Sequence, residues 1–423
     1  MAQPRTAYIS LWFPKPSETF IFREVMEMKA MGLPVHTFAL YGPLKKHLSR
    51  EMAAFSPRVQ RLGLKHLFKW PRDVWYWRKR NKPVWKELWK TLPLFRWGNL
   101  ERTGENLWAF LCGFTLARRF EELGIQHIHS PWAGGPCTAA LVASKLMGAP
   151  FSFAARAGDI HPPEGALKDK VAQATFIRVN NRANVGYIRD FAQDQADKDK
   201  VTLIYNAITL TREHDAPLPL TPPFRILALA RFVRTKGFDV LLDACKVLED
   251  LGVDFTLTMV GSGPWEARLR SQAKRLGLME RIQWPGFLSH DKVGQAMCGH
   301  DLFVAPSVVD PTGDRDGIPN VIMEAMVHAL PVVATDVAGI SEVVRDQDTG
   351  RLIKERDPQA LAQAMAEVLG DPDQARAMAK RGQDLVLDLF DRKKNCETFL
   401  NLFSRHAKGE TQGTAQAGSS REQ

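Results

Sequence analysis

The stretch from residue 301 to residue 339 constrains the fold of this chain more than any other. It begins with a short apolar segment, residues 302–306, and continues through a loop rich in Asp, Gly and Pro. A helical segment at 320–329 then leads into a second apolar segment at 332–335. Short strands of continuous apolar character are typical of parallel sheets that are buried on both faces. The stretch is therefore predicted to form a strand–helix–strand unit of an open α/β sheet.

Two acidic residues mark this unit as a candidate ligand site. Asp316 lies just before the predicted helix, and Glu324 lies inside it. Open α/β sheets bind ligands at the carboxyl ends of their strands, and the N-terminus of a helix favours an anion. Two carboxylates beside an anion site indicate a ligand with both hydroxyl and phosphate groups, such as a nucleotide sugar. The spacing alone is equally compatible with an ordinary unit whose acids are only solvated.

The run DGIPNVIMEAMVHALPVVAT resembles the signature of the family-4 retaining glycosyltransferases, in which two acids bracket seven residues and Gly-x-Pro follows the first. The first acid is Glu in most members and is Asp316 here, whereas Glu324 matches the second. The resemblance extends from about residue 8 to residue 403. It implies the GT-B fold, an α/β architecture of two Rossmann-like doubly wound domains that face each other across a cleft. It also implies a retaining, metal-independent hexosyltransferase with no cofactor other than its nucleotide diphosphate sugar substrate.

A length of 423 residues also indicates two domains. The predicted parts are an acceptor-side domain (1–205) with a basic Trp-rich insertion (58–97), a Pro-rich linker (206–223), a nucleotide-sugar domain (224–387), a helix that crosses back to the first domain (388–408) and a disordered tail (409–423). Strands of the first domain are expected at 8–12, 35–40, 127–129, 151–153, 175–179 and 201–204. Further strands of the second are expected at 226–229 and 255–260, and helices of the chain at 107–123, 340–344 and 358–369.

Two basic residues follow the first strand of the second domain. Arg231 and Lys236 are five residues apart on a loop before a helix, so they can converge on one diphosphate. Basic loop residues are usually only solvated, but the acid pair downstream favours phosphate binding. The resemblance assigns Arg231 and Lys236 to leaving-group stabilisation, Asp316 to the sugar and Glu324 to the ribose hydroxyls.

Further donor-binding residues are expected on neighbouring loops. A glycine-rich turn after the strand at 255–260 would let the backbone approach a ligand, and the segment 282–288 resembles the one that lies along the nucleotide base. The expected donor-binding residues are Gly261, Gly263, Phe287, Gly317, Ile318, Pro319 and Asn320.

The acceptor side is predicted on the loops of the first domain. The loop after the first strand contains Ser17, Glu18 and Thr19, in a SETF run that resembles the branch of exopolysaccharide and lipopolysaccharide enzymes. Ser17 or Thr19 could instead cap the following helix. Arg156 stands where the family usually has His, and Asp159 matches a family Asp. An Arg cannot act as a neutral acceptor, but it can hold a phosphate or a developing oxyanion.

The net charge of +10 is concentrated in the insertion, where twelve Lys or Arg residues face two acids and six of the eleven tryptophans occur. A basic, Trp-rich amphipathic segment favours the headgroup layer of an anionic membrane. Two alternatives stay open: single-strand nucleic-acid binding, for which no motif is present, and packing of the tryptophans on the domain. The predicted membrane contacts are Lys69, Trp70, Trp75, Trp77, Arg78, Lys79, Arg80, Trp85 and Trp89.

The cysteines and the termini indicate a compartment. Five scattered cysteines without a CxxC motif argue against a disulfide framework or a zinc site and fit a reduced cytosol. No signal peptide and no apolar run of about 18 residues is apparent. We therefore expect a cytoplasmic protein that associates peripherally with the inner face of the membrane.

These features together predict an enzyme of lipopolysaccharide or exopolysaccharide biosynthesis. Its expected partners are a nucleotide sugar, a lipid-linked saccharide acceptor and an anionic membrane surface, with no nucleic acid. Two other functions remain possible at this level: another GT-B enzyme, such as a nucleotide-sugar epimerase, and a non-catalytic membrane-bound scaffold. The sequence does not distinguish UDP from GDP as the leaving group.

Overall fold

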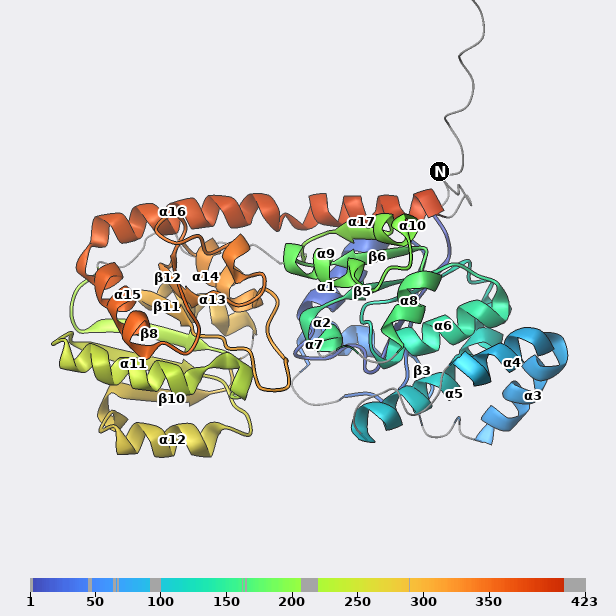
Figure 1. The fold of residues 1–423 in the computed structure, drawn as a ribbon, viewed down its shortest axis with the longest axis horizontal. Coiled ribbons are helices and arrows are strands. Elements are labelled where there is room, and N and C mark those ends of the chain that lie inside the picture. The colour runs from blue at the N-terminus through green and yellow to red at the C-terminus, as the bar shows by residue number, and fades with distance from the viewer. Residues whose placement is uncertain are drawn as a thin grey trace, which may run out of the picture.

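A computed structural model of the chain describes residues 3–44, 48–63, 66, 68–91, 100–161, 163, 166–206, 220–288 and 290–406. The predicted tail, most of the predicted linker (207–219) and the end of the insertion (92–99, which contains Trp97) lie outside the described residues. Two α/β domains lie side by side, and a long C-terminal helical segment runs across both (Figure 1).

The first domain is built on a parallel seven-stranded sheet in the order β3-β2-β1-β4-β5-β6-β7. Its strands are β1 (Thr6–Ser10), β2 (Val35–Ala39), β3 (Gln60–Arg61), β4 (His127–Ser130), β5 (Phe151–Ala155), β6 (Phe176–Val179) and β7 (Val201–Leu203). Its helices are α1 (Thr19–Ala30), α2 (Arg50–Phe55), α3 (Trp70–Arg80), α4 (Lys82–Thr91), α5 (Leu100–Leu123), α6 (Gly135–Met147), α7 (Ala157–Ile160), α8 (Leu167–Gln173), α9 (Arg182–Arg189) and α10 (Gln195–Asp199), with a 3-10 turn η1 (Ser56–Arg58). The strand order reverses between β1 and β4, which places a ligand crevice at their carboxyl ends.

Helices α5 and α6 pack closely because small residues line their contact. A Cβ added at Gly113 would lie 2.6 Å from the Cβ of Val142, so only glycine fits this crossing. The basic insertion forms the hairpin of α3 and α4, which packs beside α5 at the end of the domain that is farthest from the second domain (Figure 1).

The second domain repeats the doubly wound plan with a parallel six-stranded sheet in the order β10-β9-β8-β11-β12-β13. Its strands are β8 (Phe224–Leu229), β9 (Phe255–Val260), β10 (Ile282–Gly286), β11 (Leu302–Ala305), β12 (Val332–Thr335) and β13 (Arg351–Ile353). Its helices are α11 (Phe238–Asp250), α12 (Glu266–Arg275), α13 (His290–Cys298), α14 (Asn320–Val327) and α15 (Pro358–Gly370), with 3-10 turns η4 (Arg234–Lys236), η5 (Met279–Arg281) and η6 (Ile340–Glu342).

Two C-terminal helices connect the domains. Helix α16 (Pro372–Leu389) packs on the second domain, and α17 (Arg392–His406) continues over the first (Figure 1). Phe399 and Phe403 of α17 share a buried cluster with Ile21 and Phe22 of α1. The apolar face of α17 is therefore buried only when it lies on the first domain, which ties the end of the chain to α1.

Several local predictions differ from the structure. The first strand ends at Ser10 rather than at residue 12, and residues 340–344 contain only a short 3-10 turn. Helix α1 begins after Glu18 with no side-chain cap, so the predicted capping role of Ser17 or Thr19 is wrong. Strands β3 and β13 were not predicted, because two or three residues carry too little hydrophobic pattern.

Candidate active site

The loops after β8 and β11 meet at the carboxyl edge of the second sheet, where these two strands are neighbours. Lys236 lies in η4 after β8, and Asp316 lies in the loop after β11. The Nζ atom of Lys236 is 2.6 Å from Oδ1 of Asp316, and both side chains are largely buried. The fold thus brings together two predicted site residues that are eighty positions apart.

Ser307 holds the second oxygen of the same carboxylate. Its hydroxyl donates a hydrogen bond of 2.8 Å to Oδ2 of Asp316, and its own carbonyl accepts one from the hydroxyl of Thr335. Asp316 is therefore fixed on both oxygens by groups from different loops. Ser307 was not predicted, although a polar residue directly after a buried strand is a usable signal.

Glycines let these loops approach one another. Gly237 has a φ of +61°, and a Cβ at this position would lie 1.8 Å from the carbonyl oxygen of Pro306. Cβ atoms at Gly261 and Gly263 would lie 1.9 Å and 2.4 Å from the carbonyls of Ala230 and Phe232. The sequence predicts that the two glycines after β9 let the backbone approach a ligand. The structure shows that the packing of one loop on another already requires glycine at both positions.

The N-terminus of α14 opens beside Asp316. Pro319 is the N-cap residue, and no side chain caps the helix. The side chain of Ile318 is buried in the core, so only its backbone is left to face a ligand. Gly317 and Asn320 are half-buried on either side, and Glu324 is half-buried further along the helix. Uncapped N–H groups and the positive end of the helix dipole favour an anion here.

Two predicted donor residues have exposed side chains. Arg231 follows β8 with an exposed side chain, and within the described chain no ion pair joins it to Asp316. Phe287 follows β10 and is 58% exposed.

A cavity of about 490 Å³ lies in the first domain, at the carboxyl ends of β1 and β4. Residues from four segments line it, among them Trp12, Lys15, Glu18, Arg102, Glu105, Trp132 and Asp159. Glu18 accepts a hydrogen bond of 3.2 Å from the indole N–H of Trp132 and lies 2.6 Å from Nζ of Lys15. Of the predicted acceptor residues, Glu18 and Asp159 line this cavity, whereas Ser17, Thr19 and Arg156 do not.

Arg156 lies beneath the cavity and not in it. Its side chain is 3% exposed and stacks over the ring of Phe20, with its guanidinium carbon 4.6 Å from the ring centre. Nε donates to the carbonyl of Pro131 at 3.2 Å, and another guanidinium N–H donates to Asn206. Burial, with a contribution from nearby Arg178, lowers the pKa of Arg156 to about 10. The predicted phosphate or oxyanion contact of Arg156 is therefore wrong for this conformation, because its guanidinium is buried.

A buried ion cluster, which the sequence does not predict, supports Arg156. Glu24 of α1 accepts a hydrogen bond from Arg178 of β6, and lies 3.6 Å from Nη2 of Arg156. Arg178 also donates to the carbonyls of Ile204 (3.0 Å) and Tyr205 (2.8 Å). All three charged side chains are buried, so each depends on the others for compensation.

Asp159 is held by the backbone. One carboxylate oxygen accepts the N–H of Arg156 at 2.8 Å, and the other accepts the N–H of Ala133. Burial raises the pKa of Asp159 to about 7, and these two N–H donors and the Arg156 charge oppose that rise. The carboxyl group is thus placed to exchange a proton near neutral pH at the edge of the cavity.

The two domains contact each other next to the donor loop. A guanidinium nitrogen of Arg315 lies 3.0 Å from Nδ1 of His161 in the first domain. Burial, reinforced by the Arg315 charge, lowers the pKa of His161 to about 4, so the imidazole is neutral at pH 7 and can accept this hydrogen bond. Glu342 accepts from the hydroxyl of Tyr205 at 2.7 Å and from the N–H of Arg182 at 2.6 Å.

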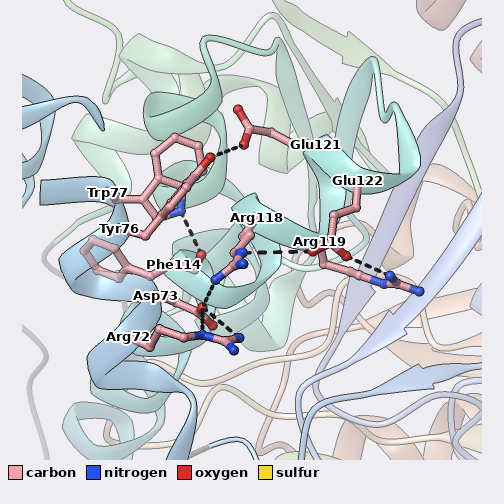
Figure 2. Close-up of polar contacts among 9 residues, drawn as sticks. All are labelled: Arg72, Asp73, Tyr76, Trp77, Phe114, Arg118, Arg119, Glu121 and Glu122. Atoms are coloured by element: carbon pink, nitrogen blue, oxygen red, sulfur yellow. Dashed lines mark hydrogen bonds and ion pairs between the residues drawn. The ribbon is translucent and has the colours of Figure 1, made fainter. Parts of the chain in front are cut away.

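Some tryptophans of the α3–α4 hairpin are buried and others are exposed. Trp77 is buried and donates a hydrogen bond of 3.0 Å to the carbonyl of Phe114 in α5 (Figure 2), so its predicted membrane contact is wrong. Trp75 and Trp89 are 55% and 42% exposed. The remaining predicted contacts are half-buried (Trp70 and Trp85) or exposed (Lys69, Arg78, Lys79 and Arg80).

Within the described part of the chain, no helix combines the length and the apolar character that crossing a membrane requires.

Comparisons with known proteins find sequence similarity in the second half of the chain. Residues 211–385 match the sequence model of the family described as "Glycosyl transferases group 1". The putative colanic acid biosynthesis glycosyltransferase WcaL of Escherichia coli (strain K12) is 35% identical over 192 residues, which cover 45% of this chain and 47% of that protein. The amylovoran biosynthesis glycosyltransferase AmsK of Erwinia amylovora is 36% identical over 143 residues, which cover 34% of this chain and 35% of that protein. The chain spans about half the length, or less, of these curated relatives.

Solved structures match almost the whole chain. Anabaena Alr3699/HepE in complex with UDP and glucose has a TM-score of 0.68 at 17% identity, and the match covers 95% of this chain and 99% of that chain. Sucrose-phosphate synthase from Thermosynechococcus elongatus has a TM-score of 0.71 at 18% identity, covering 96% and 99%. The chain therefore has the GT-B fold of two Rossmann-like domains, and residues 211–385 of it are similar in sequence to the glycosyl transferases group 1.

Proposed function

We propose that this protein is a retaining glycosyltransferase that moves a hexose from a nucleotide diphosphate sugar to a lipid-linked acceptor of lipopolysaccharide or exopolysaccharide synthesis. The observation that carries the proposal is the contact of Lys236 with Asp316 beside the uncapped N-terminus of α14. A cation, a carboxylate and free N–H groups at one sheet edge complement the diphosphate and the sugar hydroxyls of such a donor. The group 1 domain and the exopolysaccharide relatives support the same reaction class.

Donor binding would exchange the partners of Lys236. The diphosphate takes the ammonium of Lys236 and the N–H groups at Asn320, and Asp316 is then released to accept hydrogen bonds from the sugar. Arg231, exposed on the same loop as Lys236, adds its guanidinium to the diphosphate. Glu324 binds the ribose hydroxyls. Because protein cations and a helix N-terminus stabilise the departing charge, the proposed reaction needs no metal ion and no cofactor.

The leaving nucleotide is a matter for experiment, since the similar proteins point to two bases. The Anabaena structure holds UDP, and a phosphatidylinositol monomannoside mannosyltransferase of Mycolicibacterium smegmatis, 31% identical over 164 residues, is GDP-mannose-dependent. Both nucleotides therefore belong in any donor screen.

Retention is proposed to follow a front-face displacement. The acceptor hydroxyl oxygen bonds to the anomeric carbon on the face from which the diphosphate leaves, as the bond from that carbon to the phosphate oxygen breaks. The departing phosphate oxygen takes the acceptor proton. This route requires no covalent nucleophile from the protein, and the charge that develops on the diphosphate is stabilised by Lys236 and α14.

The acceptor sugar is proposed to occupy the cavity of the first domain. Trp12 and Trp132 offer aromatic faces to a sugar ring, and Glu18, Glu105 and Asp159 offer carboxylate acceptors to its hydroxyls. The exposed cations and tryptophans of the α3–α4 hairpin would hold the protein peripherally on the anionic cytoplasmic face of a membrane, where a lipid-linked acceptor is found. Each Lys or Arg near such a surface contributes about 1 kcal/mol, so binding should weaken at high salt.

The test is transfer from UDP- and GDP-sugars to lipid extracts, with the anomeric configuration of the product read by NMR and with a chelator present in parallel. Asp316→Ala should abolish transfer, and Asp373→Ala, which removes a fully exposed carboxylate of α16, should not. A donor epimer formed without any acceptor would indicate a nucleotide-sugar epimerase instead. Polysaccharide made normally in cells that carry Asp316→Ala would favour a non-catalytic scaffold.

A further inference from the structure

A second cavity, of about 330 Å³, lies on the first domain near the C-terminal end of α5, whereas the proposed acceptor cavity is at the N-terminal end of that helix. It is an open pocket bordered by the ends of β2 and β3, the start of α3 and the last turns of α5. Its charged lining consists of Arg61, Lys69, Arg72, Arg118, Arg119, Asp73 and Glu122. Five cations thus face two carboxylates, and neither the donor site nor the acceptor cavity makes use of them.

The two carboxylates are shared by three of the five cations, which leaves an excess of positive charge on the cavity wall. Oδ1 of the buried Asp73 accepts from Nη1 of Arg118 at 3.1 Å and from Nε of Arg72 at 3.3 Å (Figure 2). Glu122 pairs with Arg119 at 2.8 Å. One carboxylate oxygen shared by two guanidinium groups cannot satisfy ten N–H donors, since each guanidinium carries five.

Arg61 adds a donor from the other wall. Its terminal nitrogens donate to Ser56, Val59 and Phe13, whereas its Nε atom is buried and has no hydrogen-bond partner among the described residues. The Nε–H of Arg61 and the guanidinium groups of Arg72 and Arg118 line the same cavity, and such N–H donors suit the oxygens of a phosphate group. The cavity therefore offers a site for a phosphate.

Exposed apolar side chains beside the cavity indicate where this phosphate comes from. Phe68 is 91% exposed and directly precedes Lys69 of the cavity wall. Arg72, Trp75 and Lys79 are spaced by three and four residues along α3 and so share one helix face, where Nζ of Lys79 lies 3.6 Å from the ring centre of Trp75. Aromatic residues next to cations suit the boundary between lipid headgroups and acyl chains. A soluble phosphate would not need this apolar rim.

We propose that the cavity between α3 and α5 binds the phosphate of an anionic phospholipid, while Phe68 and Trp75 enter the adjoining acyl boundary. The site deepens the proposed membrane association, but it does not depend on glycosyl transfer. It would convert a general attraction to negative charge into recognition of a phosphate with accessible oxygens. Phosphatidic acid presents such a group, whereas the phosphate of phosphatidylserine is covered by its serine.

The test compares vesicles that contain phosphatidic acid or phosphatidylserine, adjusted to the same surface potential. The wild-type chain should bind the phosphatidic acid vesicles more tightly. The double variant Lys69→Gln/Arg72→Gln should lose that preference, with about tenfold weaker binding to phosphatidic acid than a matched control. The control, Lys86→Gln/Lys90→Gln, removes two exposed charges from α4 outside the cavity and should retain the preference. The Arg72 side chain is 61% exposed and Arg118 still compensates Asp73, so the variant should remain folded.

Equal affinity of the wild-type chain for the two kinds of vesicle would overturn the proposal. It would also fail if the cavity variant and the control variant lost affinity alike. A glycosyltransferase assay with a soluble short-chain acceptor separates the two proposals. If no transfer is found while the phosphatidic acid preference and its loss in the cavity variant are observed, the lipid site stands and the proposed function falls.

Discussion

Replacing Arg178 by Met is expected to destabilise the first domain strongly, because it removes the main cation from a buried carboxylate. Glu24 and Arg178 are 1% and 2% exposed. Without Arg178, Glu24 would keep, among the described residues, only Nη2 of Arg156 at 3.6 Å and the hydroxyl of Tyr8 at 3.4 Å, and both distances are too long for strong hydrogen bonds. The carbonyls of the chain segment that follows β7 would also lose their guanidinium donors.

The expected cost follows from the burial of both partners. Removing one partner of a buried ion pair costs about 3–5 kcal/mol. In a domain of this size 1 kcal/mol corresponds to about 2–4 °C, so the melting transition of the first domain should fall by about 6–20 °C. Urea unfolding and calorimetry would measure the change directly. The ligand-free protein is the sample, so that donor binding does not shift the transition.

A double-mutant cycle tests whether the unpaired charge of Glu24 causes this loss of stability. Glu24→Leu/Arg178→Met removes both charges and should be less destabilised than Arg178→Met alone, since no unpaired carboxylate remains. If Arg178→Met cost less than about 1 kcal/mol, or if the costs of the two single replacements simply added, the reasoning that Arg178 compensates Glu24 would be refuted.

Three further predictions concern pH, backbone and acceptor. Between pH 6.5 and 4 the unfolded chain protonates His161 while the folded chain does not, because burial and Arg315 lower the pKa of His161 in the fold to about 4. The free energy of unfolding should therefore fall as pH falls through this range. The melting temperature of His161→Gln should fall less over the same range than that of the wild-type chain. Gly237→Ala should lower the free energy of unfolding in urea by about 2–5 kcal/mol, because its Cβ would meet a carbonyl oxygen at 1.8 Å. The control Gly277→Ala, at φ +75° in open space, should lower it by only about 1–2 kcal/mol. Equal costs for the two variants would show that the clash at Gly237 does not occur. Trp132→Ala should raise the KM for acceptor about tenfold and leave the KM for donor unchanged, and the opposite pattern would remove Trp132 from the acceptor site.

The fold could be predicted from the sequence because its strands are apolar on both faces. Central strands such as residues 302–305 and 332–335 are continuous runs of buried side chains, and the pattern places them within one residue. The edge strands β3 and β13 have half-buried side chains and only two or three residues, so hydrophobicity carries almost no information about them. Helix α5 begins at Leu100 rather than at residue 107, because its first turns are polar and border the acceptor cavity.

The candidate site could be predicted only where loops follow strongly patterned strands. The loops of Lys236 and Asp316 could each be assigned to a strand end, but their 2.6 Å contact depends on the pairing of β8 with β11. From its sequence pattern, Glu24 is predicted to lie on the polar face of an amphipathic helix. Arg178 lies between two apolar strand residues and is predicted to face solvent. Both are buried because α17 and the segment after β7 cover them, and that covering arises from distant parts of the chain.

The tryptophans of the insertion are a second case in which the sequence does not predict which side chains are buried. Trp75 and Trp77 lie two residues apart in a basic helix, and composition treats them alike. The helix turns about 200° between them, so one faces solvent while the other is buried against α5. Which of the two is buried depends on the rotation of α3 about its own axis, and contacts with α5 fix that rotation.

The central claim is that the edge formed by Lys236, Asp316 and α14 binds the diphosphate of a nucleotide donor. Calorimetric titration of UDP and GDP into the wild-type chain, Lys236→Ala and Lys246→Ala tests it most directly, because Lys246 is an exposed lysine of α11 whose partners are surface acids. One nucleotide should bind the wild-type chain and Lys246→Ala equally, and should bind Lys236→Ala about 30-fold more weakly or worse, as expected for loss of a buried charged contact. Binding to Lys236→Ala with wild-type affinity, or no binding of either nucleotide to the wild-type chain, would contradict the claim.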